Sequence, residues 1–132
     1  MSKNIKIEFA NFDDLSSWMD LVNLLKMNFP GLHTEKLLVA YRETVIKNIN
    51  RQTAICAKDN NSVVGILLFS KNQNMLCCMG VHSDYRRIEI ANKLIEEMLT
   101  CLPKDSEITI ITFRTEDEKA LRQEPYIKVL VL

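Results

Sequence analysis

The residues best suited to chemistry lie in one short segment, Val81 to Ala91, which reads Val-His-Ser-Asp-Tyr-Arg-Arg-Ile-Glu-Ile-Ala. This segment joins an apolar, strand-like run to a helical pattern. The first N–H groups of a helix have no intrahelical partner, and the helix dipole favours an anion there by about 0.3–1 kcal/mol. The segment therefore predicts a pyrophosphate site to which Arg86 and Arg87 supply charge. The alternative is a basic surface loop that only begins a helix.

The four cysteines, by contrast, do not form a metal-binding pattern. They are Cys56, Cys77, Cys78 and Cys101, and a metal site would need paired ligands at a short spacing with a second pair elsewhere. Adjacent residues of a strand point to opposite faces, so Cys77 and Cys78 cannot easily share an ion. We expect no metal, buried structural thiols and a reducing, cytoplasmic location.

Composition limits the class of protein. The chain has 132 residues, 47% of them hydrophobic and 26% charged, with 17 basic and 17 acidic side chains. These values are typical of one soluble globular domain, which we place at residues 1–132. No basic face, long apolar run or signal-like N-terminus is present, so we expect no nucleic-acid partner and no membrane partner.

The first half of the chain predicts a strand and two helices. Residues 3–9 alternate apolar and charged side chains, which indicates a half-buried strand. Asn11 can cap a helix with an apolar stripe, and Thr34 can cap a second helix that runs to about Asn50. The predicted stripes are Phe12, Leu15, Trp18 or Met19, Val22 and Leu25 on the first helix, and Leu37, Leu38, Tyr41, Val45 and Ile49 on the second. The sequence Asn28-Phe29-Pro30-Gly31 separates the two helices.

The second half predicts a mixed sheet. Three strands, at 53–58, 63–70 and 75–81, are joined by short turns rich in Asn and Asp, which favour antiparallel hairpins. A helix with Ile90, Leu94, Ile95, Met98 and Leu99 on one stripe and a buried strand at 107–113 then complete a parallel β-α-β crossover. A short helix should start at the capping box of residues 115–118, and 126–132 could form a last strand. The predicted fold class is α/β, of the α+β type, with a mostly antiparallel mixed sheet and helices on both faces.

Two motifs make the chain resemble a known family. GCN5-related N-acetyltransferases (GNAT) have a strand, a loop of the pattern Gln/Arg-x-x-Gly-x-Gly/Ala and a helix, and Arg86, Arg87, Ile88, Glu89, Ile90 and Ala91 take those places here. The preceding Val81-His82-Ser83-Asp84-Tyr85 is similar to the family's Val-x-Pro-x-Tyr/Phe approach. The element order also matches over most of the chain.

The resemblance implies acetyl-CoA as co-substrate. In the family the pantetheine arm lies between two splayed strands, which would give Met79 and Val81 backbone contacts to it. The amides of Arg87, Ile88, Glu89, Ile90 and Ala91 would hold the pyrophosphate, with Arg86 in the same loop, while Asn92 and Lys93 would approach the phosphates.

Two positions depart from the family pattern. Glu89 stands where the family has its first glycine, and a left-handed backbone there would cost about 1–2 kcal/mol. A carboxylate about 6 Å from the pyrophosphate would add about 3 kcal/mol of repulsion at an effective dielectric constant near 20, whereas an outward one could pair with Arg87 or Lys93. The C-terminus is the second departure. Tyr126-Ile127-Lys128-Val129-Leu130 resembles the start of a Tyr-x-Lys-x-Gly-Phe segment, and the chain stops at Leu132. An open edge there favours a homodimer through the C-terminal strand.

The implied function is N-acetyl transfer from acetyl-CoA to a primary amine of a small molecule or a protein. Tyr126 would protonate the leaving thiolate, and the base would be a carboxylate acting through water, or His82. The acceptor would enter near residues 29–34. The alternatives are a catalytically degenerate acyl-CoA-binding or protein-interaction module of the same fold, and a purely structural α/β domain.

Overall fold

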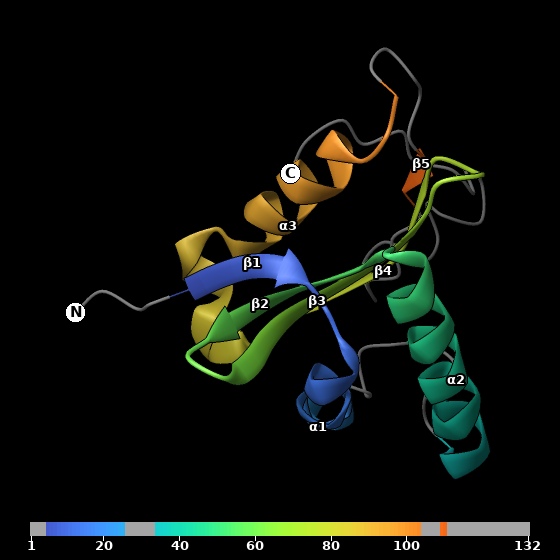
Figure 1. Ribbon diagram of the computed structural model, residues 1–132. Helices are drawn as coiled ribbons and strands as arrows, with labels where there is room; N and C mark the ends of the chain where they lie inside the picture. Colours follow the sequence, from blue (N-terminus) through green and yellow to red (C-terminus); the bar gives the residue numbers. More distant parts are fainter. Residues whose placement is uncertain (1–4, 26–33, 104–108, 111–132) are drawn as a thin grey trace, which may run out of the picture.

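The computed structural model describes residues 5–25, 34–103 and 109–110, which form a sheet with helices on both of its faces (Figure 1). The strand order is β1-β2-β3-β4-β5. The strands are β1 (Ile5–Phe9), β2 (Ala54–Asp59), β3 (Ser62–Ser70), β4 (Met75–Val81) and β5 (Thr109–Ile110). β1 to β4 are antiparallel to their neighbours, and β5 runs parallel to β4. This arrangement confirms the predicted mixed sheet and its parallel crossover.

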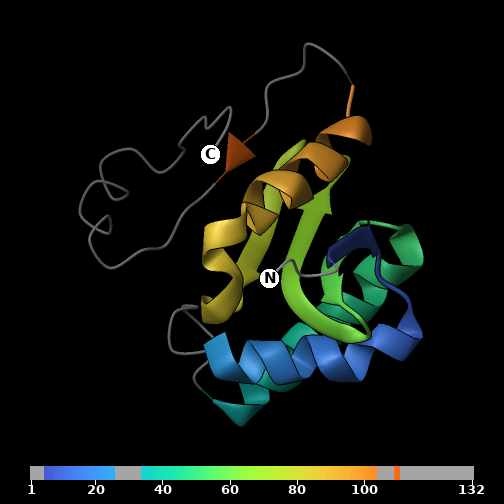
Figure 2. The ribbon, with the colours of Figure 1, turned by 90° about the vertical axis from the view of Figure 1, so that its left-hand side faces the viewer.

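The helices divide between the two faces. A 3-10 turn, η1 (Phe12–Asp14), leads into α1 (Leu15–Leu25), and α2 (Glu35–Arg51) follows. A longer 3-10 segment, η3 (Ser83–Ile88), leads into α3 (Ile90–Thr100). Figure 2 shows α1 and α2 on one side of the strands and α3 on the other.

Each face of the sheet has its own apolar core. On one face α1 and α2 pack over β2 and β3, with Trp18, Val22, Val45, Ile66 and Leu68 among the buried side chains. On the other face α3 packs over the same strands, with Ile55, Leu67, Phe69, Leu94 and Met98 buried. The continuous apolar run of β3 follows from this, because residues of both parities are covered.

Side-chain caps set where the first two helices begin. Asn11 accepts from the N–H of Asp13, and the carboxylate of Asp14 accepts from the N–H of Asn11, which completes a capping box. Thr34 Oγ1 accepts from the N–H of Leu37 at 3.2 Å. Both caps were predicted from the sequence and are confirmed.

The predicted apolar stripes are wrong at their margins. Phe12 is 54% exposed, and Leu37 and Leu99 are each 37% exposed, because no other element packs over these edges of the helices within the described residues. Leu21, which the first stripe omitted, is buried instead. Helical periodicity locates the centre of a buried face but does not determine how far the neighbouring element extends over it.

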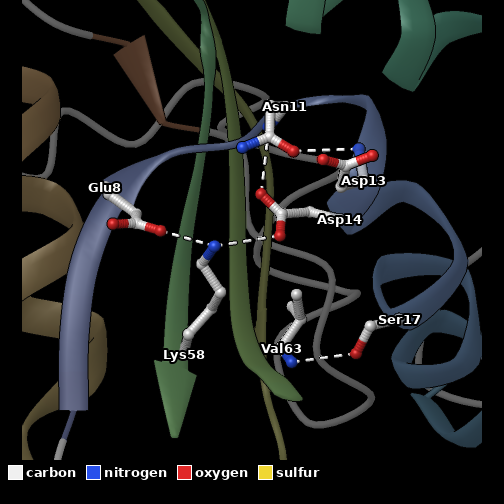
Figure 3. Close-up of polar contacts among 7 residues, drawn as sticks. All are labelled: Glu8, Asn11, Asp13, Asp14, Ser17, Lys58 and Val63. Carbon is white, nitrogen blue, oxygen red and sulfur yellow. Dashed lines mark hydrogen bonds and ion pairs between the residues drawn. The ribbon is translucent and has the colours of Figure 1, made fainter. Parts of the chain in front are cut away.

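A polar cluster ties α1 to the sheet (Figure 3). Lys58 Nζ on β2 lies 2.5 Å from Glu8 Oε2 on β1 and 2.9 Å from Asp14 Oδ1. The hydrogen bond with Glu8 raises the pKa of the Lys58 ammonium, and the contact with Asp14 adds to this effect against the opposing effect of burial. Ser17 Oγ on α1 also accepts from the N–H of Val63 at 2.9 Å. These contacts fix the position of α1 relative to β1, β2 and β3.

Several predictions fall outside the described residues: the helix break at 28–31, the strand at 107–113 other than its residues 109–110, the capping box at 115–118 and the strand at 126–132. Within the described part of the chain, no helix combines the length and apolar character that crossing a bilayer requires.

Candidate functional site at the end of strand β4

A β-bulge interrupts β4 at Cys77. Leu68 of β3 lies opposite Cys78, but the next residue, Phe69, lies opposite Leu76, so Cys77 has no partner on β3. The extra residue changes which side chains share a face. Leu76 packs on the α3 side, whereas Cys78, two residues later, packs on the side of α1 and α2. In a regular strand both would face the same way.

Beyond the bulge, one edge of β4 presents its backbone away from β3. The N–H of His82 donates to the carbonyl of Val64 at 2.8 Å, and hydrogen-bonded pairs alternate along an antiparallel ladder. Gly80 and Cys78 therefore bond to β3, while the backbone groups of Met79 and Val81 face the side of β5. Within the described residues β5 pairs only with Met75 and Leu76. Met79 consequently has no described strand opposite it on that side.

The loop after β4 is folded into the six-residue 3-10 segment η3 and held by local contacts. His82 Nδ1 accepts from the N–H of Asp84 at 3.1 Å, and the His82 ring meets that of Tyr85 edge-on. The hydroxyl of Tyr85 donates to Asp59 Oδ2 at 2.6 Å, a contact that raises the pKa of the Tyr85 phenol. These contacts tie the loop to the turn between β2 and β3.

Glu89 forms the junction between η3 and α3. Its backbone is left-handed, with φ 60° and ψ 27°, and its exposed side chain does not cap α3. The first intrahelical bond runs from the N–H of Lys93 to the carbonyl of Glu89 at 3.2 Å. The preceding N–H groups, of Ile90, Ala91 and Asn92, are the ones that a helix leaves without an intrahelical acceptor. The start of α3 therefore retains its capacity to bind an anion.

Gly65 allows α3 to begin close against the sheet. A Cβ added to Gly65 would lie 2.9 Å from Ile90 Cγ2, 3.2 Å from Ala57 Cβ and 3.3 Å from Leu94 Cδ1. The first contact is shorter than real side chains tolerate, so a side chain at this position would push the first turn of α3 outward. Gly65 therefore sets the position of the helix N-terminus beside the end of β4.

A partly buried chain of polar contacts lies under β4, on the face that α1 and α2 cover. Trp18 Nε1 donates to the hydroxyl of Tyr41 at 3.2 Å, and that hydroxyl lies 3.5 Å from Cys78 Sγ. Since the Tyr41 oxygen accepts from Trp18, its own O–H is available to donate to Cys78. Burial raises the pKa of the Cys78 thiol to about 11, despite the hydrogen bond from Tyr41 that favours the thiolate. Burial, followed by Cys78, raises the pKa of Tyr41 well above its ordinary value. The chain thus consists of neutral groups at pH 7 and links α1 and α2 to β4 beside the bulge.

Comparison with known families shows to which family the chain belongs. The model of the acetyltransferase (GNAT) family matches residues 18–122. The chain belongs to the GNAT acetyltransferase family. The resemblance drawn from the segment Arg86–Ala91 and the order of elements is therefore confirmed.

Solved GNAT structures share the fold at low identity. The PaiA N-acetyltransferase of Thermoplasma acidophilum, in complex with coenzyme A, has a TM-score of 0.62 at 13% identity, covering 92% of this chain and 88% of that one. AAC(6')-Iy, in complex with the bisubstrate analogue CoA-S-monomethyl-acetylneamine, has a TM-score of 0.64 at 17% identity, covering 98% and 95%. The NatC complex bound to Gag peptide and CoA has a TM-score of 0.62 at 19% identity, covering 92% and 82%. No curated protein sequence matches the chain.

The predicted GNAT site residues fall into three groups. Two of the residues, Met79 and Val81, lie in the last three residues of β4, and a further four lie at the start of α3: Glu89, Ala91, Asn92 and Lys93. Ile90 lies there too, but its side chain is buried in the core, so only its backbone can face a ligand. The backbones of Arg86, Arg87 and Ile88 lie in η3, and their side chains are outside the described structure. Tyr126 and residues 29–33 of the predicted acceptor entrance are also outside it.

The structure also corrects the expectation for the cysteines. All four thiols are free, but only Cys56 is buried, Cys78 and Cys101 are half-buried, and Cys77 is exposed at the bulge. The expectation of buried thiols is wrong for Cys77, because the bulge pushes this residue out of the regular alternation. The described residues contain no cluster of metal-ligating side chains.

The sequence did not predict the roles of the residues that pack against this candidate site. Gly65 gave a usable signal, since an isolated glycine in an apolar strand marks a close approach of another element. Tyr41 gave none, because its partner Cys78 is 37 residues away in the chain. The bulge at Cys77 is likewise invisible in a run of apolar residues.

Proposed function

We propose that the protein is an N-acetyltransferase that transfers an acetyl group from acetyl-CoA to a primary amine of a small molecule or a protein. One observation carries the proposal. The outward backbone of Met79, with no described strand opposite it, lies at the same end of the sheet as the uncapped N-terminus of α3. A backbone edge beside a helix N-terminus suits a ligand with amides at one end and phosphates at the other.

The residues present fit acetyl-CoA. The first N–H groups of α3, on Ile90, Ala91 and Asn92, would hold the pyrophosphate, and the exposed Lys93 would add positive charge. Arg86 and Arg87 would contribute further charge from η3. The N–H and C=O of Met79 would pair with amides of the pantetheine arm, with Val81 on the same side as a further contact. The bound co-substrate supplies an electrophilic thioester carbonyl.

The chemistry needs little beyond positioning and one polarising donor. The amine nitrogen attacks the thioester carbon, the C–S bond breaks, the amine loses a proton and the thiolate gains one. Holding the two reactants in line removes much of the barrier, and a backbone N–H at the end of β4 would stabilise the developing oxyanion. We propose Tyr126 as the acid that protonates the thiolate.

His82 is a poor candidate for the general base. A neutral imidazole has one donor and one acceptor nitrogen, and the acceptor, Nδ1, already receives the N–H of Asp84 at 3.1 Å. The other nitrogen, Nε2, then carries the proton and cannot accept another. We therefore assign deprotonation of the amine to a carboxylate acting through water, and assign to His82 a structural role in η3.

The acceptor class is supported by the solved structures. One of them contains an acetylated neamine linked to CoA, and another contains a peptide together with CoA, so the fold accommodates both small-molecule and protein amines. A cytoplasmic location and a homodimer through the C-terminal strand edge remain predictions that belong to this proposal.

The second candidate function is a catalytically degenerate module that binds acyl-CoA, or a protein, without transferring the acyl group. One observation favours it. Glu89 occupies the first glycine position of the family motif and has a left-handed backbone there, which adds conformational strain. Its carboxylate also places a negative charge at the start of α3.

Calorimetric titration with acetyl-CoA tests the binding step. We expect micromolar binding, weakened by Arg86→Ala and tightened several-fold by Glu89→Gln, because the amide keeps the shape of the side chain and removes its charge. Glu96→Gln, an exposed position on the same helix, is the matched control and should leave the affinity nearly unchanged. Absence of binding by wild type and by Glu89→Gln would disprove the proposal.

Thiol release separates the two candidate functions. An enzyme should liberate free CoA thiol from acetyl-CoA in the presence of an accepted amine, at a rate that rises with amine concentration. Binding of acetyl-CoA without thiol release across polyamines, aminoglycosides and peptide N-termini would favour the binding module.

A further inference from the structure

β1 is an edge strand with a regular outward-facing backbone. Its only strand partner among the described residues is β2. The N–H of Ala10 donates to the carbonyl of Ala54 at 2.9 Å, and the register between β1 and β2 is unbroken from there. By the alternation of an antiparallel ladder, Lys6 and Glu8 bond to β2, whereas the N–H and C=O groups of Ile5, Ile7 and Phe9 point outward.

We propose that β1 is a homodimer interface, in which the β1 strands of two copies of this chain pair antiparallel about a two-fold axis at Ile7. In this register Ile7 lies opposite Ile7, Ile5 opposite Phe9, and Lys6 opposite Glu8. All the outward-facing residues then form hydrogen-bonded pairs, each of which exchanges two backbone hydrogen bonds. An isologous interface requires this self-complementarity, since each residue must suit its own counterpart across the axis.

The apolar side chains of β1 match in the same register. Ile5 and Ile7 are half-buried against the core under α3, while Phe9, which has the same parity, is 37% exposed. Pairing would place Ile5 of the second copy beside Phe9. The exposed aromatic ring at the end of β1 would then be covered by an aliphatic side chain on the same face.

The charged side chains of β1 favour a second copy of this chain as the partner that pairs with its outward edge. On the other face of β1, Glu8 and Asp14 contact the single ammonium of Lys58, so that group carries one uncompensated negative charge (Figure 3). The Glu8 side chain is 43% exposed. Lys6 is exposed and has no ion pair among the described residues.

In the dimer the Lys6 side chain of one copy reaches Glu8 of the other, and the reverse contact forms across the axis. Directly opposite side chains of a non-hydrogen-bonded pair have Cβ atoms about 4.5–5.5 Å apart. Charges then alternate in the order Asp14, Lys58, Glu8 and Lys6 of the second copy. In each copy, Lys6 of the other copy then neutralises the uncompensated negative charge of the Glu8, Asp14 and Lys58 group. Each Lys6 thereby gains an ion-pair partner.

This interface leaves the candidate functional site open. β1 and β4 are separated by β2 and β3 in the sheet, so pairing at β1 covers neither the outward edge of β4 nor the start of α3. It also differs from the dimer through the C-terminal strand edge. Loss of the β1 dimer should therefore leave acetyl-CoA binding unchanged.

Sedimentation equilibrium measures the association directly. We expect a concentration-dependent self-association through β1 that Lys6→Glu weakens at least tenfold, because this change places Glu opposite Glu8 twice. Lys36→Glu, at the exposed first turn of α2, alters the net charge equally and should change the dissociation constant less than twofold. A monomer at all concentrations, or equal weakening by both variants, overturns the proposal.

Amide hydrogen exchange tests the register. In the dimer the amides of Ile5, Ile7 and Phe9 should become protected as protein concentration rises, since they then donate across the axis. The amides of Lys6 and Glu8 already donate to β2 and should be protected at all concentrations. A dimer in which Ile7 exchanges as fast as in the monomer would use another surface and would overturn the proposal.

Discussion

At the scale of single residues, the most informative position is Glu89. Four described non-glycine residues have positive φ: Gln52, Asn60, Asn74 and Glu89. Asn60 and Asn74 lie in hairpin turns, where asparagine tolerates this backbone, and Gln52 ends α2. Glu89 alone lies at the start of a helix proposed to bind phosphates. Two substitutions separate strain from charge at this residue, because glycine relieves both and glutamine relieves only the charge.

Glu89→Gly should stabilise the fold by up to about 1 kcal/mol, since the relief of a left-handed backbone of about 1–2 kcal/mol exceeds the entropic cost of glycine. Urea unfolding of the wild type and the variant measures the difference. The matched control is Glu96→Gly, in the right-handed interior of α3, which should lose about 1 kcal/mol. A loss of stability in both variants would show that the backbone at Glu89 is not strained.

The sequence predicts contacts that are local and misses those that are not. Asn11 and Thr34 were predictable as caps because each acts on a backbone N–H two or three residues away. The contact from Tyr41 to Cys78 depends on how α2 packs over β4, which no local pattern encodes. The loop contact between Tyr85 and Asp59 is equally remote, at 26 residues.

At the scale of elements, the strength of the local signals separates correct from incorrect predictions. β2, β3 and β4 were located to within a residue or two, because short turns rich in Asn and Asp bound them. The predicted loop after β4 proved to be the 3-10 segment η3, which the polar sequence of residues 83–87 did not indicate. The bulge at Cys77 also had no signal, although it decides which β4 side chains face α3.

Gly65→Ala tests how closely α3 must approach the sheet. The added Cβ would lie 2.9 Å from Ile90 Cγ2, so we expect a loss of about 1–3 kcal/mol in unfolding free energy and weaker binding of acetyl-CoA. Urea unfolding and calorimetry measure the two effects. The double variant Gly65→Ala/Ile90→Ala removes the clashing methyl group and should lose less stability than the two single changes added together. Strict additivity would mean that the two residues are not coupled.

At the scale of the whole molecule, the balanced composition and length predict a single domain, but they carry no information about the exposed edges of the sheet. Whether β1 and the outward side of β4 are paired is decided by the order of strands in space. The shielding of the Cys56 and Cys78 thiols is a further property of the whole fold, because it depends on the elements that cover the sheet. Burial raises the pKa of Cys56 to about 12 and that of Cys78 to about 11.

Stability should therefore fall at alkaline pH. Unfolded thiols ionise near pH 9.0, their ordinary pKa, whereas the folded ones keep their protons to about 11 or 12. Above pH 9 the unfolded chain binds fewer protons than the folded one, so the free energy of unfolding decreases as pH rises toward the folded values. Urea titrations across pH 8 to 11 measure the slope. Cys56→Ala should flatten it, and an unchanged slope would contradict the assigned cause.

The central claim, that the outward edge of β4 and the start of α3 form one acetyl-CoA site, is tested most directly by amide NMR during titration with coenzyme A. We predict the largest shift changes at the N–H groups of Met79, Ala91 and Asn92, with the amide of Ile7 on the far edge of the sheet unmoved. Saturating changes confined to other residues, or no changes at millimolar coenzyme A, would contradict the claim.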